Sequence, residues 1–317
     1  MTEVKEKHTR ISPSWMTRFS AMVKYELLWN IRKKKFLGII VVAFALTTLL
    51  LVVPKILQNI TGEPLTQNPE DYVIGTGTGI GGLGFFLFAV ATVMNSISGE
   101  FESGSIIPLL TKPVSRTTVF LGKLFAAFLT ILAAYTLIMV YFAIGGTIIY
   151  GPQNNLHLVS LLLIGNIFST FVWVALVLAI GSIFKSSLIA ALGSFGVWLA
   201  TYLITPIISM FSEQAWILTY VLGTGATGYI LDVPSQTPFT PGMAVATGTD
   251  AVGTNLINYL LHPTAEVTFL KRLIGGSPLY TETLSLILFR SIFVTTVYII
   301  LFLFISWFIF KRAEVLE

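Results

Sequence analysis

The sequence of 317 residues contains no cysteine, so the chain can form no disulfide and offers neither a thiolate nucleophile nor a cysteine metal site. Histidine is also rare: His8, His157 and His262 are far apart in sequence and show none of the spacings of metal ligands. His262 with Asp232 or Asp250 could supply two members of a hydrolase triad, but nothing marks a serine nucleophile. We therefore expect no catalytic residue and no metal site.

A phosphate-binding loop is missing as well. The pattern Gly-x-x-x-x-Gly-Lys-Ser/Thr, whose backbone amides cradle the phosphates of ATP, occurs nowhere in the chain. No acidic residue follows a strand-like run in the way that would place a carboxylate on Mg²⁺. The chain is therefore not an ATPase, and we expect it to bind no cofactor of its own.

Charged residues are scarce, at 11% of the chain, whereas a typical soluble protein has about 25%. Hydrophobic residues make up 55%, and the mean hydropathy is +0.84. The sequence lacks the alternating ten-residue segments that are typical of a membrane-spanning barrel. This composition indicates an integral membrane protein built from helices.

Six apolar runs are long enough to cross a hydrocarbon core of ~30 Å as helices. They cover approximately residues 36–57, 73–98, 117–149, 156–184, 188–211 and 283–310. We therefore expect an all-α membrane protein with six transmembrane helices. Its parts are an N-terminal segment 1–35, the first five spans in 36–211, a connecting segment 212–282, and the sixth span with a tail in 283–317.

Lysine and arginine are concentrated on one side of these spans. Fifteen of them lie in 1–35, in the loop 99–123, at position 185 and in the tail, whereas three lie in the other connections. Positive residues favour the cytoplasmic side of a membrane. We therefore expect both termini and the loop 99–123 to be cytoplasmic and the segment 212–282 to be extracellular, in a multi-pass protein of the cell membrane.

The residues before the first span predict a helix of their own. The stretch 14–35 reads SWMTRFSAMVKYELLWNIRKKK, with Ser14 as a plausible N-cap. Trp15, Phe19, Met22 and Trp29 fall near one face, and cations occupy the others. An amphipathic, cationic helix just before a span usually lies in the lipid interface.

The connecting segment 212–282 is too long for a simple turn. Its part Glu213–Leu231 is apolar but interrupted by glycines, which predicts a half-inserted or interfacial hairpin. Asn255–Leu261 and Ala265–Ile274 predict short amphipathic helices on either side of His262-Pro263. We expect a helical extracellular segment, and an ordinary cap that shields a dimer is the alternative to a functional role.

The loop Gly99–Lys123, GEFESGSIIPLLTKPVSRTTVFLGK, is too polar for lipid and too short for a domain. Its residues suit a short helix on the membrane surface, which Lys112-Pro113 would end because proline lacks the backbone N–H of a helix interior. Ser115 can then cap the third span. A solvated hairpin between two spans is the alternative.

One family shares the order of residues in this loop. The pattern of Glu100, Glu102, Gly104, Ser105, Leu109-Leu110, Pro113-Val114-Ser115-Arg116 and Leu121-Gly122-Lys123 resembles the loop between the second and third spans of the type-2 ATP-binding-cassette (ABC) permeases. Ser105 stands where the family more often has threonine. The resemblance implies a coupling helix that docks on an ATPase subunit. It assigns this coupling to Glu100, Glu102, Gly104, Ser105, Leu109, Leu110, Pro113, Ser115 and Arg116.

The N-terminal helix shares in this resemblance. Lys24-Tyr25-Glu26-Leu27 followed by Arg32-Lys33-Lys34-Lys35 is similar to the interface helix of the family, which also touches the ATPase. The resemblance therefore makes Lys24, Glu26 and Arg32 candidate contacts. The outer helices expected between the fifth and sixth spans resemble those that the family places over its translocation path.

The resemblance implies the membrane-spanning permease subunit of an ATP-driven exporter. Two copies, or one copy with a related subunit, would enclose the path and bind two ATPase subunits, which would carry ATP and Mg²⁺. The expected partners are therefore the ATPase dimer, a second permease and the lipid bilayer, with no nucleic acid. The apolar spans favour a lipid, a hydrophobic drug or a peptide as substrate. The alternative is a six-span assembly or sensor protein that does not engage an ATPase.

Arg290 is an ionisable residue inside the sixth span. A charge at such a position costs about 2.5–3.5 kcal/mol on insertion scales, so it usually faces protein or a wet cavity. Glu282 would be a little over two turns away on a continuous helix and is not an ideal partner. We expect Arg290 to point into the bundle or dimer and to contact backbone carbonyls, water or an anionic substrate group. Snorkelling to the outer interface is the alternative.

Overall fold

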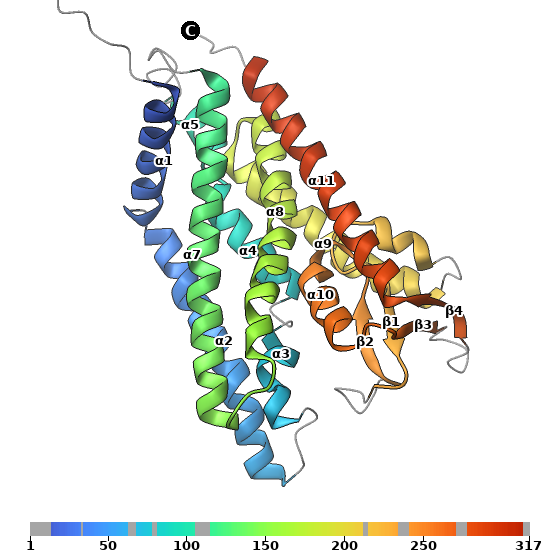
Figure 1. The fold of residues 1–317 in the computed structure, drawn as a ribbon. Coiled ribbons are helices and arrows are strands. Elements are labelled where there is room, and N and C mark those ends of the chain that lie inside the picture. Colours follow the sequence, from blue (N-terminus) through green and yellow to red (C-terminus); the bar gives the residue numbers. More distant parts are fainter. Residues whose placement is uncertain are drawn as a thin grey trace, which may run out of the picture.

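The computed structural model describes residues 14–32, 34–62, 68–77, 81–104, 115–211, 215–233, 241–270 and 278–312. Within these residues, six helical stretches are long and apolar enough to cross a membrane. They are Ile40–Thr61, Gly84–Glu102, Arg116–Tyr150, Leu156–Phe184, Ser187–Thr205 and Leu284–Arg312. The predicted six-span, all-α membrane fold is therefore confirmed (Figure 1).

The central helix of the bundle is α8 (Val159–Phe184), which follows the 3-10 turn η3 (Leu156–Leu158). In its most apolar stretch 72% of the residues are buried, against 11% for α2 (Lys34–Thr61). Helices α4 (Gly81–Val93), α7 (Arg116–Tyr150), α9 (Ser187–Phe211) and α11 (Leu284–Arg312) surround it. The core of the protein therefore lies along α8, and α2 is left for lipid or another chain to cover.

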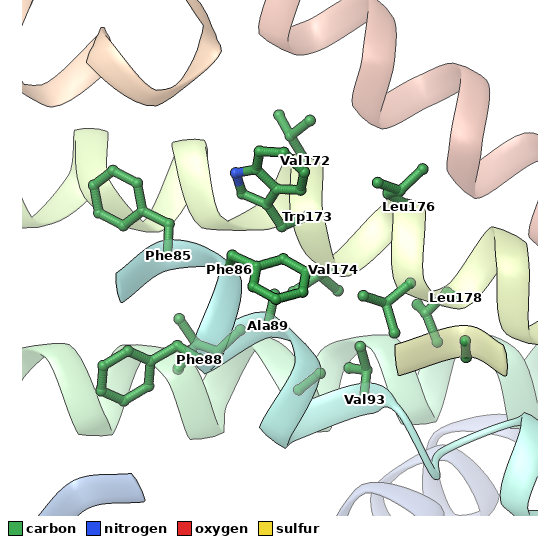
Figure 2. Close-up of a cluster of buried hydrophobic side chains, with 14 of the residues drawn as sticks. Phe85, Phe86, Phe88, Ala89, Val93, Val172, Trp173, Val174, Leu176 and Leu178 are labelled. Carbon is green, nitrogen blue, oxygen red and sulfur yellow. The ribbon is translucent and has the colours of Figure 1, made fainter. Parts of the chain in front are cut away.

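The core between α8 and α4 is aromatic (Figure 2). The fully buried Trp173 meets the ring of Phe86 edge-on, with centroids 5.8 Å apart. Phe88 packs on Tyr135 of α7 at 5.0 Å. Edge-to-face ring pairs add to the stabilisation that burial alone provides. These contacts fix the second span to the central helix and to the third span.

The first span continues beyond residue 57, where it was expected to end. Pro54 lies inside α2, which extends to Thr61. Proline lacks an N–H, so the carbonyl of Leu50 four residues earlier loses its helical donor. The Tyr72 hydroxyl donates to this carbonyl at 2.5 Å, and the Tyr150 hydroxyl donates to that of Leu51 at 2.7 Å. Two tyrosines that stack on each other therefore donate hydrogen bonds to the backbone carbonyls around the proline, and the helix continues.

The second span is broken rather than continuous. It comprises α3 (Tyr72–Gly77), preceded by the 3-10 turn η1 (Pro69–Asp71), then α4 and α5 (Ser98–Glu102). A turn at residues 94–97 separates α4 from α5. The Ser98 hydroxyl donates to the Met94 carbonyl across this turn and satisfies part of the interrupted backbone. The break lets α5 leave the line of α4 at the end of the bundle where α1 (Trp15–Arg32) packs.

The segment between the fifth and sixth spans contains a sheet as well as helices. Four antiparallel strands have the order β2-β1-β3-β4. They are β1 (Thr227–Ile230), β2 (Met243–Ala246), β3 (Glu266–Leu270) and β4 (Pro278–Thr283). The 3-10 turns η4 (Ala215–Tyr220) and η5 (Thr249–Ala251) and the helix α10 (Val252–Leu261) complete the segment.

These strands correct two predictions. The helix expected over Ala265–Ile274 is wrong, because β3 occupies its described part and pairs with β4. Val267 and Phe269 of β3 are both buried, and the Phe269 ring stacks on Tyr280 at 4.4 Å. The hairpin expected over Glu213–Leu231 is also wrong, since η4 and β1 lie there. The helix expected over Asn255–Leu261 is confirmed as α10.

Candidate functional site

Three charged side chains meet where α1, α5 and α7 converge. The ammonium Nζ of Lys123 lies 2.5 Å from Glu26 Oε1 and 2.6 Å from Glu100 Oε1. The side chains of Lys123 and Glu26 are 3% and 6% exposed, so this is a buried ion pair with a second, less buried carboxylate. We call these three residues the ion cluster. They connect the N-terminal helix, the broken second span and the third span.

Sequence reasoning proposed Glu26 and Glu100 as separate ATPase contacts, and the structure brings them together on a residue outside that list. Lys123 lies in the second turn of α7, in a run of otherwise apolar residues. A charge in such a run was the signal that could have identified it. Lys24 and Arg32, the other candidates on α1, are exposed and lie outside the cluster.

Helix α1 packs along the first turns of α7 (Figure 1). The indole Nε1 of Trp15 donates to Thr118 Oγ1 at 3.1 Å. The two backbones approach closely at Gly122, where an added Cβ would lie 2.8 Å from Met22 Cγ. The stretch 15–32 is thus helical, as predicted, and its buried residues are Met22, Val23 and Glu26. Its place in a lipid interface and its contact with an ATPase stay predictions.

Glu102 ends α5 and accepts hydrogen bonds from the start of α9. Ser186 Oγ donates to its Oε1 at 2.8 Å, and the backbone N–H of Ser187 donates at 2.9 Å. Ser187 Oγ also donates to Oε2. A carboxylate at a helix N-terminus satisfies free amides and complements the helix dipole. Glu102 therefore fastens the beginning of the loop 99–123 to the turn between the fourth and fifth spans.

Two further candidates lie at the start of α7. Ser115 Oγ accepts a hydrogen bond from the Thr118 N–H at 3.1 Å, which confirms the predicted cap. Arg116 Nη1 donates to the carbonyl of Lys311 at 3.0 Å, in the last turn of α11. Gly104 has a positive φ of 66°, a conformation that favours glycine. The candidates Ser105, Leu109, Leu110 and Pro113, and with them the coupling helix itself, lie outside the described residues.

A cavity of about 580 Å³ lies beside the ion cluster. Its walls come from α1, from the turn between α4 and α5, and from α5. The lining residues are Tyr25, Glu26, Trp29, Asn30, Ala91, Thr92, Asn95, Ser96, Gly99, Glu100, Glu102, Ser103 and Lys123. Three of the candidate residues, Glu26, Glu100 and Glu102, therefore line this cavity.

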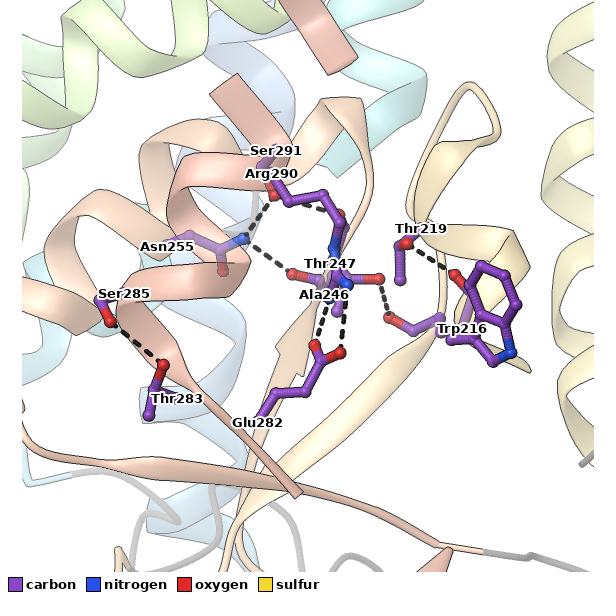
Figure 3. A network of polar contacts seen from close by, with 11 residues as sticks. Trp216, Thr219, Ala246, Thr247, Asn255, Glu282, Thr283, Ser285, Arg290 and Ser291 are labelled. Atoms are coloured by element: carbon purple, nitrogen blue, oxygen red, sulfur yellow. Dashed lines mark hydrogen bonds and ion pairs between the residues drawn. The ribbon is translucent and has the colours of Figure 1, made fainter. Parts of the chain in front are cut away.

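Arg290 forms an ion pair with Glu282, and its guanidinium contacts both carboxylate oxygens (Figure 3). The guanidinium carbon also lies 5.9 Å from the ring centroid of Tyr220. The expectation that Glu282 was a poor partner is wrong, because Glu282 belongs to β4 and α11 begins only at Leu284. The helical rise used for that estimate therefore does not apply. Contact of Arg290 with water or an anionic substrate group stays a prediction.

The surroundings of this pair are largely buried. Burial raises the pKa of the Tyr280 hydroxyl to about 12, the negative charge of Glu282 acts in the same direction, and the positive charge of Arg290 opposes it. Tyr280 is therefore neutral at physiological pH. The pair joins the sheet to the sixth span.

A sequence model of ABC-2 family transporter proteins matches residues 20–315, which include the ion cluster, the loop 99–123 and Arg290. The chain belongs to the ABC-2 transporter family. It is therefore a membrane permease subunit of an ABC transporter, and it works with a separate ABC ATPase subunit. No curated protein matches the chain significantly. Family membership disfavours the alternative of a six-span protein that never engages an ATPase.

Proposed function

We propose that this ABC-2 permease is the membrane half of an ATP-driven exporter, and that its ATPase docks at the end of the bundle that holds α1, α5 and the start of α7. The excess of lysine and arginine at this end supports a cytoplasmic location for it and for both termini. The family's coupling loop would present residues 99–123 to the ATPase. ATP and Mg²⁺ would then be bound by the ATPase subunits.

The observation that carries this proposal is the set of polar connections at that end. Lys123 joins α7 to α1 and to α5, and Glu102 joins α5 to α9. A displacement of the loop would therefore act on several helices at once through charge-assisted bonds, which are stronger than neutral ones. ATP can shift the permease between two states only if the ATPase binds these states with different affinity. The bonds of Lys123 and Glu102 would connect the docked loop to the helices whose arrangement differs between the two states.

Two copies of the permease, or one copy with a related subunit, would enclose the translocation path of the substrate. The exposed apolar side chains of α2 support this, because the described part of the chain leaves most of them uncovered. A lipid, a hydrophobic drug or a peptide is the proposed substrate, because the spans offer few polar groups to a small ion.

Reconstitution of the permease with its ATPase in liposomes tests the coupling role. Glu102→Ala removes the acceptor at the start of α9, so we expect the ATPase to remain bound in a pull-down while the ATP hydrolysis of the complex falls about fivefold or more. Glu70→Ala is the matched control, because Glu70 is exposed in η1 on the opposite side of the spans. Equal hydrolysis in both variants and in the wild type would refute the proposal.

A further inference from the structure

A segment of the outer region enters the helix bundle between α8 and α11. Ser291 Oγ of α11 donates to the carbonyl of Thr247 at 3.0 Å (Figure 3). Asn255 Nδ2 of α10 donates to the carbonyl of Ala246 at 3.0 Å and to Ser291 Oγ at 3.2 Å. The chain between Thr247 and Asn255 therefore lies among the spans, and η5 is its middle part.

Asp250 lies in this inserted part, with a residue exposure of only 8%. Its Oδ1 accepts a hydrogen bond from the indole Nε1 of Trp173 at 2.8 Å. Trp173 is the fifteenth residue of the 26 in α8, so it is roughly 21 Å from one end of that helix and roughly 17 Å from the other at 1.5 Å per residue. A carboxyl group is therefore held beside the middle of the central span.

No cation compensates this carboxyl within the part of the chain that the structure describes. The helices α4, α8 and α10, which contact η5, contain no Asp, Glu, His, Lys or Arg. On α11, Arg290 is already paired with Glu282, and Lys311 and Arg312 lie at the far end of the helix. A nearby titratable group is the Tyr135 hydroxyl of α7, which is hydrogen-bonded to Thr170. The helices α10 and α11 also carry Tyr259 and Tyr298.

The second carboxyl oxygen, Asp250 Oδ2, is buried without a hydrogen-bond partner among the described residues. Four more buried polar atoms on the same elements share this condition: Asn166 Nδ2, Ser169 Oγ, Asn255 Oδ1 and Thr295 Oγ1. Asn166, Ser169 and Trp173 are spaced by three and four residues, so they share one face of α8. An ionised carboxylate at such a place is far more costly than a neutral acid. Consistently, burial raises the pKa of Asp250 to about 7, and the hydrogen bonds from the side chains of Trp173 and Thr249 oppose this only in part.

We propose that Asp250 is a proton-binding site inside the permease. Burial without a cation favours the neutral acid, and the carboxyl releases its proton when the pH rises through its midpoint. The O–H bond on the carboxyl breaks, its electron pair stays on the oxygen, and the proton passes to water. The site is independent of the ATPase-docking role proposed above, because it lies in a different part of the bundle and involves none of the same residues.

Infrared spectroscopy of the purified full-length permease tests this site. A protonated carboxylic acid has a C=O stretch above the amide bands, and this stretch shifts in D₂O. The wild type minus Asp250→Asn difference spectrum should contain this band at acidic pH and should lose it as the pH rises through about 7. Asp232→Asn, which changes an exposed carboxyl, should leave the band in place. A difference spectrum that shows only an ionised carboxylate from about pH 5 upward would overturn the proposal.

A second variant covers the case in which Asp250→Asn does not fold. Trp173→Phe removes the N–H donor to Oδ1 and keeps an aromatic ring in the core. The donor stabilises the carboxylate more than the acid, so its loss should raise the midpoint of the infrared titration by about one pH unit. An unchanged midpoint in Trp173→Phe would contradict a proton held at this position.

Discussion

At the scale of single residues, Lys123 has an ammonium group that is buried yet lies between two carboxylates. Moving a lone charge into a protein costs several kcal/mol, and the partners offset that cost only while all of them are present. The ion cluster therefore makes Lys123 one of the main contacts between α1 and α7.

We expect Lys123→Met to lower the free energy of unfolding by about 3–5 kcal/mol, because it leaves Glu26 and Glu100 without their cation. Unfolding of the detergent-solubilised permease measures this loss. Lys24→Met is the matched control, since Lys24 is an exposed lysine on α1, and its change should stay within about 0.5 kcal/mol. Adding Glu26→Gln to Lys123→Met should recover part of the loss. Equal losses in the two single lysine variants would contradict the ion cluster.

Some side-chain contacts could be predicted from the sequence and others could not. Ser115 was recognisable as a cap because capping depends on neighbouring residues only. Lys123 was not recognised, since its partners lie 97 and 23 residues away in the chain. Glu282 was rejected as a partner of Arg290 because a helix was assumed where the chain is extended. Local patterns predict local bonds, whereas buried ion pairs depend on the tertiary fold.

At the scale of elements, the long helices followed from the sequence because about 20 apolar residues have few alternatives in a bilayer. The four strands did not, since each has only four to six residues and pairs with residues distant in the chain. The break at 94–97 was also missed, although Asn95 and Ser96 interrupt the apolar run there.

The contact between α8 and α10 brings two backbones together at glycines. A Cβ added to Gly165 would lie 2.3 Å from Gly253 Cα. We therefore expect Gly165→Ala to destabilise the permease by about 1–3 kcal/mol, since backbone cannot yield as a flexible side chain can. Thermal unfolding in detergent measures this change.

Gly196→Ala is the matched control for that variant. Gly196 also lies in a transmembrane helix, α9, but an added Cβ there would meet nothing within 4 Å. Alanine favours helix over glycine by about 0.5–1 kcal/mol, so this variant should be neutral or slightly stabilised. The same destabilisation in both variants would show that the close approach of α8 and α10 is unimportant.

At the scale of the whole molecule, the permease has two structurally different ends. One end gathers α1, α5 and the starts of α7 and α9 around the ion cluster and the adjacent cavity. The other carries the sheet and the segment that inserts between α8 and α11 (Figure 1). The proposed docking site of the ATPase lies at the first end, and the proposed proton-binding site lies in the inserted segment.

Cross-linking of single-cysteine variants to the ATPase tests the docking end most directly, because the chain contains no cysteine of its own. A photoreactive cross-linker attached to Ser103→Cys or Lys24→Cys, both exposed at the α1–α5 end, should capture the ATPase subunit in the assembled complex. His157→Cys is exposed in η3 on the opposite side of the spans and should capture none. Capture at His157→Cys together with none at Ser103→Cys and Lys24→Cys would contradict docking of the ATPase at the α1–α5 end.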